Sequence, residues 1–578
     1  MASGENIYLL TVLGRDPKGA RYTLGGKVAE ARLAPLALIE LLREAEKPQI
    51  VVALCTPEAR EESLPLLTDG LRDRCEVKPV DVPGGDSQED VKTYLARAAT
   101  AIPADQKAQL IVDVTHGYRH FSFLTYVAVL FLVGLRGVRL RGAYYGLLRK
   151  DEVSPFLDLR PLLELPRWFH ALEVLREAGS ALPMAAALET GQQDPTASTI
   201  ARELRQISEG YLSGLPLELG QHARRFCDQR LKPLKRVLDV DHHLPLAAEL
   251  GKRLREILEP FALDEALTGD GWKQQVALTT TELDRQAKVI DDLLARESVA
   301  TALGLMNEWT VSWASLRLGR EKGWLDLQGV RRSAGSLLGA VAAVGRDPDL
   351  RDLLTEEQCK LGKFWHDLCD LRNAYHHHGM RPQVLVGDAQ VSAKLERVRD
   401  YWETVLRSRP SLSLALGALR GGRVLVSPMG RRPGVLFSAL HACRSIGPGE
   451  LTSCLVICSQ ETEGFIVEAS KRAGYEGNIE ALCLEDPFGG RPEIERLVKA
   501  ARPKLLGADE VLVNVTGGTT LMGLAAEALA DAARRLARPV RRFGLIDRRP
   551  PALQDADPFQ IGEPFWLDSA EDGDGNDD

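Results

Sequence analysis

One short stretch of the chain carries side chains suited to cutting RNA. It reads LGKFWHDLCDLRNAYHHHGMRP and contains Arg372, Asn373 and three consecutive histidines that begin at His376. An arginine holds a phosphate through paired hydrogen bonds and stabilises developing negative charge. A histidine titrates near neutral pH and moves protons, while an asparagine positions the imidazole or a phosphate oxygen. These groups suit phosphodiester cleavage by the 2′-hydroxyl of the RNA itself, which requires no metal.

The apolar residues around this stretch predict that the reactive side chains lie in the last turns of a helix. They recur at helical spacing and are followed by a typical helix stop: Leu361, Phe364, Trp365, Leu368, Leu371 and Tyr375, then Gly379 and Pro382. A protonated imidazole in the last turn gains from the helix dipole. Arg372 and His377 are five residues apart and diverge by about 140° around a helix. One helix therefore builds an incomplete pocket, and we expect a composite site made by two such helices.

Two other interpretations of the histidine run stay open. The residues can be a surface cluster beside an ordinary amphipathic helix. They can also bind a metal ion, but no acidic or cysteine partner stands at a convincing spacing, so we expect no metal and no cofactor.

A second group of candidate residues follows strand-like runs near both ends of the chain, where a ligand is expected to bind. In the first part these residues are Gly14, Arg15, Thr115, His116, Gly117 and Arg119. In the last part they are Ser427, Gly430, Thr516, Gly517, Gly518 and Thr519. Glycine permits close backbone approach, threonine offers a hydroxyl, and arginine or the backbone amides before a helix suit phosphate. Packing at strand ends is the alternative role. The absence of GxGxxG after either first strand argues against a dehydrogenase.

The elements that position these residues predict an α/β protein with an all-α middle. Residues 1–160 alternate apolar strands, such as 7–13 and 109–114, with helices, such as 29–45, which is typical of a parallel sheet covered on both faces. Residues 161–418 show helical periodicity, with irregular connections near 191–196 and 269–271. A linker at 417–424 leads into residues 421–567, which repeat the first architecture, and an acidic tail occupies 568–578. Ligands of such sheets lie beyond the carboxyl ends of the strands.

Composition places the protein among ordinary globular chains. It has 578 residues, 44% of them hydrophobic, and a formal net charge of -8, so nucleic-acid contact must come from local basic patches. Nine scattered cysteines without a CxxC pair indicate reduced thiols and a cytoplasmic protein. The N-terminus reads as a strand, not a signal peptide, and the apolar run 121–135 is too short to cross a membrane, so we expect a buried helix.

Two weaker signals lie in the helical region. The segment RRFCDQRLKPLKR (224–236) is basic, and it is either a solvated helix face or a contact to the RNA backbone. Arg236 followed by His242 and His243 also fits a loose Arg-to-His spacing. We interpret that match as chance; the alternative is a degenerate second half of the RNA-cutting site.

The reactive stretch resembles a known family. RNAYHHHG (372–379) is similar to the R-N-x-x-x-H-x-G form of the HEPN ribonuclease motif, and the register matches Arg372, Asn373 and His377 to its members. In the first part, LLTVLGRD, DVTHGYRHFSFL and RGAYYGLL resemble the CARF domain of Csm/Csx-type ancillary ribonucleases of type III CRISPR systems. In the last part, VSPMGRRPG and VNVTGGTTLMGLA are also similar to CARF domains. The resemblance covers nearly the whole chain.

This resemblance implies a concrete function. Such proteins bind a cyclic oligoadenylate at a CARF dimer interface, and their paired HEPN domains then cut single-stranded RNA without metal, leaving a 2′,3′-cyclic phosphate and a 5′-hydroxyl. The second CARF-like domain departs from the usual chain. It implies either a homodimer or pairing of the two domains within one chain. The alternative functions are a sensor or a ring nuclease, in which a CARF domain binds or degrades the ligand and the HEPN domain only dimerises.

Overall fold

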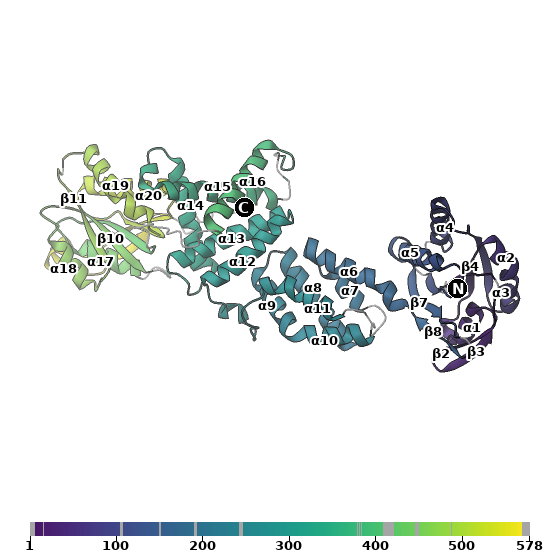
Figure 1. The fold of residues 1–578 in the computed structure, drawn as a ribbon. Helices are drawn as coiled ribbons and strands as arrows, with labels where there is room; N and C mark the ends of the chain where they lie inside the picture. The colour runs from purple at the N-terminus through teal and green to yellow at the C-terminus, as the bar shows by residue number, and fades with distance from the viewer. Residues whose placement is uncertain are drawn as a thin grey trace. The chain divides into compact units, whose positions relative to one another are not determined.

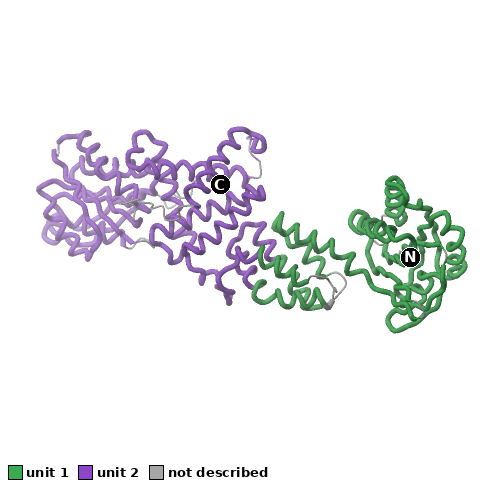
Figure 2. Tube along the Cα trace, viewed as in Figure 1, with its two compact units in different colours: residues 1–205, 226–257 green, residues 206–225, 258–578 purple. Residues whose placement is uncertain are grey.

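The structure is a computed structural model that describes residues 6–15, 17–103, 108–149, 152–189, 194–241, 247–377, 380, 382, 384–407, 421–444, 450–486 and 488–568. The chain forms two compact units (Figure 2). Unit 1 comprises residues 1–205 and 226–257, and unit 2 comprises residues 206–225 and 258–578. The division falls inside the region predicted to be helical. The predicted linker and acidic tail lie mostly outside the described residues; Asp568 itself accepts hydrogen bonds from Arg542.

Residues 7–158 fold into an α/β domain around a mainly parallel sheet (Figure 1). Its strands are β1 (Ile7–Val12), β2 (Ala20–Leu24), β3 (Lys27–Ala31), β4 (Ile50–Cys55), β5 (Glu76–Asp81), β6 (Gln109–Asp113), β7 (Arg139–Gly146) and β8 (Ser154–Asp158). Its helices are α1 (Ala34–Leu41), α2 (Pro57–Glu62), α3 (Leu64–Leu71), α4 (Gln88–Thr100) and α5 (Arg119–Arg136). The strand order is β3-β2-β8-β7-β6-β1-β4-β5, and the five strands from β7 to β5 are parallel. The fold is Rossmann-like, as the sequence predicted.

The central strand of this sheet is buried on both faces. Leu9 belongs to the core beneath α1 and α3, whereas Leu10 and Val12 belong to the core beneath α4 and α5. Because successive side chains of a strand point to opposite faces, a strand between two helix layers must be apolar throughout. This requirement explains the unbroken run IYLLTV in β1.

The helix predicted over residues 29–45 is wrong in its first part. Residues 29–31 belong to β3, which pairs antiparallel with β2, and the helix α1 spans only Ala34–Leu41. Gly25 and Gly26 connect the two strands with φ values of 56° and 78°. Two consecutive residues with positive φ form the type of turn that closes a two-residue hairpin. The hairpin inserts before α1 and delays the start of that helix.

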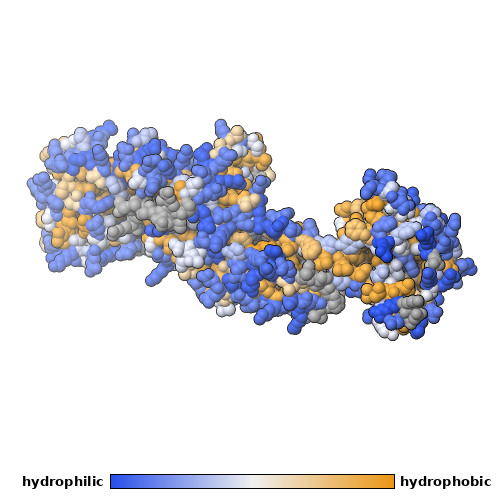
Figure 3. All heavy atoms as spheres, viewed as in Figure 1, coloured by the Kyte–Doolittle hydropathy of each residue, from blue (hydrophilic) through white to orange (hydrophobic). Residues whose placement is uncertain are grey.

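Helix α5 is long and apolar enough to cross a membrane by length and composition alone, although only a third of its 18 residues are buried. It connects β6 to β7 in the same sheet and buries Phe121, Leu124, Ala128 and Leu132 against that sheet. This packing is that of a crossover helix that buries one face, so the predicted burial holds for that face and not for the whole helix. Its outer face exposes Phe123, Phe131 and Leu135, and Figure 3 shows a hydrophobic surface in this area.

The middle of the chain is helical, as predicted, and contains no strand among its described residues. In unit 1 the α-helices are α6 (Arg160–Ala178), α7 (Leu182–Glu189), α10 (Leu231–Arg236) and α11 (Ala247–Leu258), with α8 (Pro195–Leu212) reaching into unit 2. In unit 2 they are α9 (Pro216–Arg225), α12 (Thr280–Ala295), α13 (Val299–Arg317), α14 (Arg332–Arg346), α15 (Glu356–His376) and α16 (Ala389–Tyr401). Short 3-10 and π-helical turns lie at 44–46, 226–230, 237–241, 259–261, 272–275, 327–331, 351–353 and 402–407.

The last domain repeats the topology of the first. Its strands are β9 (Arg423–Pro428), β10 (Leu451–Ser459), β11 (Asn478–Leu484), β12 (Glu510–Asn514), β13 (Val540–Ile546) and β14 (Glu563–Trp566), in the order β11-β10-β9-β12-β13-β14. Its helices are α17 (Gly434–Arg444), α18 (Phe465–Arg472), α19 (Arg491–Leu506), α20 (Thr520–Arg535) and α21 (Pro551–Ala556). The first five strands are parallel and β14 is antiparallel, so β9 corresponds to β1 and β12 to β6.

Helix α14 belongs to two packing layers of unit 2. Leu337, Val341 and Val344 lie in one hydrophobic core with Val424 and Val426 of β9. On its other side α14 packs along α15, and the closest approach is at Gly362, where an added Cβ would lie 2.7 Å from the carbonyl oxygen of Val341. The C-terminal sheet and the helix that carries the candidate reactive residues are therefore joined through one helix.

Candidate functional site

The predicted reactive residues lie at the carboxyl end of α15, as the spacing indicated. The helix starts at a capping box, in which Thr355 accepts from the Gln358 amide, and His377 is the first residue beyond its last turn. Arg372 and Asn373 are half-buried, and His377 is exposed. His378 and Gly379 lie outside the described residues.

Arg372 and Asn373 form the polar centre of this helix end. Arg372 Nη1 donates to Asn373 Oδ1 at 2.9 Å. Asn373 and His377 are one turn apart, so they share a face of α15, and the hydrogen bond turns the guanidinium toward that face. Asn373 therefore connects Arg372 to the face of α15 that carries His377.

No carboxylate in the described part of the chain neutralises Arg372. The nearby Asp367 and Asp370 on the same helix are paired with Arg397 and Lys394 of α16. The Arg372 guanidinium keeps its positive charge and donors available for an anion, because its one hydrogen bond goes to a neutral amide. A phosphate is the type of group that such a guanidinium binds.

The structure separates the two described histidines of the run. The ring of His376 lies over Gly304 of α13, where an added Cβ would be 2.9 Å from His376 Nε2. His377 lies on the exposed end of α15. About two turns before His377, burial raises the pKa of Cys369 to about 11 although Arg372 acts in the opposite direction, so this thiol stays protonated at neutral pH. The side chains of His376 and His377 are both exposed, so exposure alone does not distinguish the two imidazoles.

In the first α/β domain, the predicted ligand residues gather at the carboxyl ends of β1 and β6. An added Cβ at Gly14 would lie 3.1 Å from the amide nitrogen of Gly117, whose φ is 94°, so both loops depend on glycine. Arg119 is the exposed first residue of α5, and Arg15 lies over the ring of Tyr118 at 5.9 Å.

Two residues of this loop are engaged in internal hydrogen bonds. Thr115 accepts from the Gly146 amide at 2.8 Å and donates to Asp113. His116 Nε2 accepts from the amide of Ala34, the first residue of α1, at 2.9 Å. Burial lowers the pKa of His116 while Asp113 opposes that shift, so the ring is neutral and able to accept. The structure shows His116 accepting at the start of α1, and its predicted role as a ligand contact stays a prediction.

The last domain places most of its predicted residues around a cavity of about 930 Å³. Gly430, Thr516, Gly517, Gly518 and Thr519 line it, and Ser427 is buried beneath them. The cavity lies at the carboxyl ends of the parallel strands, where ligands of such sheets bind. Binding by these residues remains a prediction.

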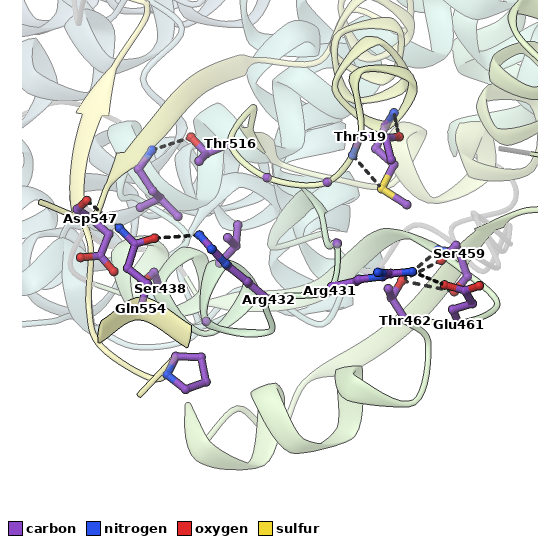
Figure 4. A pocket seen from close by; sticks show the side chains of 18 of the residues that line it. Arg431, Arg432, Ser438, Ser459, Glu461, Thr462, Thr516, Thr519, Asp547 and Gln554 are labelled. Carbon is purple, nitrogen blue, oxygen red and sulfur yellow. Dashed lines mark hydrogen bonds and ion pairs between the residues drawn. The ribbon is translucent and has the colours of Figure 1, made fainter. Parts of the chain in front are cut away.

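Charged and aromatic side chains that the sequence analysis missed complete the lining. Figure 4 shows Arg431 and Arg432 pointing to opposite sides of the cavity. Arg431 is paired with Glu461 at 3.3 Å, and Arg432 with Asp555 at 2.7 Å. Phe488 stands at the rim and is 95% exposed. The two consecutive arginines that follow the strand-end glycine in VSPMGRRPG are the sequence signal that could have identified this charged lining.

The two domains use the same hydrogen-bond scheme below these loops. In the first, Thr11 donates to Asp113 at 2.8 Å, and the Thr115 amide donates to Asp113 at 3.1 Å. In the last, Asn514 donates to Ser427 at 3.0 Å and accepts from the Thr516 amide at 2.9 Å. The sequence analysis did not identify Thr11, Asp113 or Asn514 as site residues. The signal was the tripeptides DVT (113–115) and NVT (514–516), which follow equivalent strands of the two domains.

The two weaker signals have different outcomes. In the basic segment, Arg224, Arg225 and Arg230 are engaged with Glu259, the Leu267 carbonyl and Glu203, respectively. Lys232, Lys235 and Arg236 remain exposed. His242 and His243 lie outside the described residues, so the Arg236 match stays untested.

Among the residues that the structure describes, no three His, Cys, Asp or Glu side chains cluster as metal ligands do, and all nine cysteines are free thiols.

Comparison with known proteins gives one partial similarity. The CRISPR-associated protein MJ1674 of Methanocaldococcus jannaschii is 27% identical over 114 residues, which cover 19% of this chain and 18% of that protein. No family model matches the chain.

Proposed function

We propose that this protein is a CRISPR-associated endoribonuclease that cuts single-stranded RNA without a metal ion and is activated by a cyclic oligoadenylate. The observation that carries the proposal is the end of α15, where the Arg372 guanidinium is bonded to Asn373, is not neutralised by any described carboxylate, and lies in the same last turns of the helix as the exposed His377. The similarity to a CRISPR-associated protein supports the biological role. The motif resemblance supports the reaction.

The chemistry follows from the three side chains. The 2′-hydroxyl of the RNA attacks the adjacent phosphorus, and the bond to the 5′-oxygen breaks. Arg372 binds the phosphate oxygens and stabilises their added charge. An imidazole accepts the proton of the 2′-hydroxyl, and an imidazolium donates one to the departing 5′-oxygen. The products are a 2′,3′-cyclic phosphate and a 5′-hydroxyl.

The reaction needs two proton carriers, and the motif resemblance assigns one imidazole, that of His377, to each α15. We therefore expect a homodimer in which two copies of α15 face each other. A symmetric dimer brings the same surface of both chains together, so each copy would contribute Arg372, Asn373 and His377. Pairing of the two α/β domains within one chain is the alternative arrangement for ligand binding.

Cleavage of a fluorescent single-stranded RNA in EDTA, with each cyclic oligoadenylate in turn, tests the proposal. We expect cleavage that needs the ligand and falls by about 10²- to 10⁴-fold in His377→Ala, the usual contribution of an acid–base group. His376→Ala is the matched control, because its ring lies against α13, and it should retain most activity.

Other outcomes point to other functions. Ligand binding without RNA cleavage would indicate a sensor whose helical domain only dimerises. Consumption of the ligand, unaffected by His377→Ala, would indicate a ring nuclease.

A further inference from the structure

The two α/β domains carry equivalent strand-end positions, which makes a residue-by-residue comparison possible. Gly14 approaches Gly117 in the first domain as Gly430 approaches Gly518 in the last, with added Cβ atoms at 3.1 and 3.0 Å from the facing backbone. Thr115 accepts from the amide of Gly146 on β7, and Thr516 accepts from the amide of Leu545 on β13. In this register His116 corresponds to Gly517.

The first domain fills this position with its own side chain. The His116 imidazole accepts a hydrogen bond from the first residue of α1, the helix that follows β2 and β3 after the central strand. Below it stands the carboxylate of Asp113, which Thr11 and Thr115 hold in place. A carboxylate at this position disfavours a bound phosphate through like-charge repulsion.

In the last domain the loop itself places no side chain at the same position, where Val435 of α17 packs against the backbone of Gly517. Gly517 has no side chain and a φ of 103°, and an added Cβ would lie 2.8 Å from Val435 in the first turn of α17. The same turn of α17 lines the cavity with Gly434, Val435 and Ser438. The residue that corresponds to Asp113 is Asn514, which carries no charge.

The open cavity combines groups that recognise a nucleotide. The amides of Gly517 and Gly518 have no protein acceptor among the described residues and precede α20, an arrangement that suits phosphate. Arg431 is 86% exposed on its side chain, and among the described residues it is paired with Glu461 alone, so a phosphate competes with one carboxylate for it. The exposed Phe488 at the rim offers a ring on which a base can stack.

From these differences we infer that the cavity of the C-terminal domain is the nucleotide receptor of the chain and that the corresponding N-terminal position is closed by His116. The inference rests on the proposed function, because it assigns the activating cyclic oligoadenylate to one of two similar domains. The N-terminal domain then contributes a folded scaffold and its exposed surfaces, without binding this ligand at its strand ends.

A pair of charge reversals at equivalent positions tests the inference in the full chain. Arg15 and Arg431 each follow the strand-end glycine, and both are exposed, so Arg15→Glu and Arg431→Glu should fold alike. The measurement is equilibrium binding of labelled cyclic tetra-adenylate and cyclic hexa-adenylate. For the probe that binds, we expect Arg431→Glu to weaken binding by about 10- to 100-fold, as for loss of a charged hydrogen bond, and Arg15→Glu to change it by less than about threefold.

A third variant checks that the cavity itself is occupied. Glu461→Gln removes the carboxylate that competes for Arg431, so binding should tighten by a few-fold. Weaker binding in Arg15→Glu, with or without an effect of Arg431→Glu, would overturn the inference and leave the proposed function intact. Absence of binding to the unmodified chain would overturn the proposed function and this inference with it.

Discussion

Arg372 and Asn373 are sequence neighbours whose backbone positions differ by about 100° around α15, yet their side chains meet. A lysine at position 372 would keep the charge but lose the planar fork that reaches both Asn373 and a phosphate. We therefore expect Arg372→Lys to lower the single-turnover cleavage rate nearly as much as Arg372→Ala, by about 10- to 100-fold. The unfolding midpoint should stay unchanged, because the side chain is only half-buried. A normal rate in Arg372→Lys would show that charge alone is sufficient.

His116 should make the N-terminal domain sensitive to acid. Burial lowers the pKa of this histidine, and only the neutral ring accepts from the Ala34 amide. The unfolded chain, with a histidine pKa of about 6.5, then binds more protons than the folded chain. The contribution of His116 to stability is complete above that pH and is lost as the pH falls through the lowered folded value.

His116→Gln keeps an acceptor that does not titrate in this range. The measurement is hydrogen exchange of the α1 amides, corrected for the intrinsic exchange rates. Between pH 7 and pH 5 these amides should lose less protection from exchange in His116→Gln than in the unmodified chain. Equal losses in both chains would contradict the role assigned to His116. His116→Ala, which removes the cap, should destabilise the domain by roughly 1 kcal/mol.

At the residue scale, side-chain types and local spacing were predictable and long-range contacts were not. The end of α15 could be placed because apolar spacing within one helix fixes which residues come last. The contact between His116 and Ala34 joins residues 82 positions apart, and no local pattern announces it. For the same reason His116 was predicted as a ligand contact. The orientation of His376 over Gly304 likewise depends on how α13 packs against α15.

At the element scale, the contact between α14 and α15 depends on a missing side chain. An added Cβ at Gly362 would approach the Val341 carbonyl carbon and oxygen to 3.0 and 2.7 Å, and backbone atoms cannot rotate away. We expect Gly362→Val to push the helices apart and to lower the free energy of unfolding by about 1–3 kcal/mol, as overpacking does. Urea unfolding followed by tryptophan fluorescence measures the change, since Trp365 lies in α15 and Trp313 lies in α13, which packs against both helices.

Gly339→Ala provides the matched control on α14. No atom lies within 4 Å of its added Cβ, so the substitution should stabilise the helix by roughly 0.5–1 kcal/mol. Similar destabilisation by both variants would argue that helix packing at Gly362 is not the cause.

Buried elements were more predictable than exposed ones. The strands β1, β4, β6, β9 and β12 are centred on consecutive apolar residues because helices cover both faces. The strands β5 and β14 lie at sheet edges and are largely exposed, so their sequences carry little apolar signal, and neither was predicted. The hairpin of β2 and β3 was missed because the alanines and leucines after it suggested one long helix.

At the scale of the whole molecule, the sequence predicted two α/β regions and a helical region between them. It did not predict which helices pack against which sheet. The apolar face of α14 resembles that of any amphipathic helix, and only the fold shows that it completes the core of the C-terminal sheet. The repeated topology of the two α/β domains was predicted, whereas the different filling of their strand ends depends on His116 and Gly517.

A polar contact beside the shared core should couple the receptor domain to the reactive helix. Asp509, just before β12, accepts from Arg320 at 3.0 Å and from the Gly422 amide at 2.6 Å, and Ser333 of α14 also donates to it. Removing this carboxylate deprives the half-buried Arg320 of its ion pair with Asp509 and the Gly422 amide of this acceptor, which costs about 1–3 kcal/mol. We expect Asp509→Ala to loosen α14 from the C-terminal domain.

The expected consequence is a loss of activation without a loss of binding. In Asp509→Ala the affinity for the cyclic oligoadenylate should stay within about threefold, since the residue does not line the cavity, while ligand-stimulated RNA cleavage should fall by about tenfold, the equivalent of ~1.4 kcal/mol of coupling. Asp531→Ala is the control, because Asp531 is exposed and, within the described part of the chain, pairs with Arg534 of its own helix alone. Full activation of Asp509→Ala would mean that the ligand signal reaches α15 by a path other than this contact, and a parallel loss of affinity would mean that Asp509 supports the cavity itself.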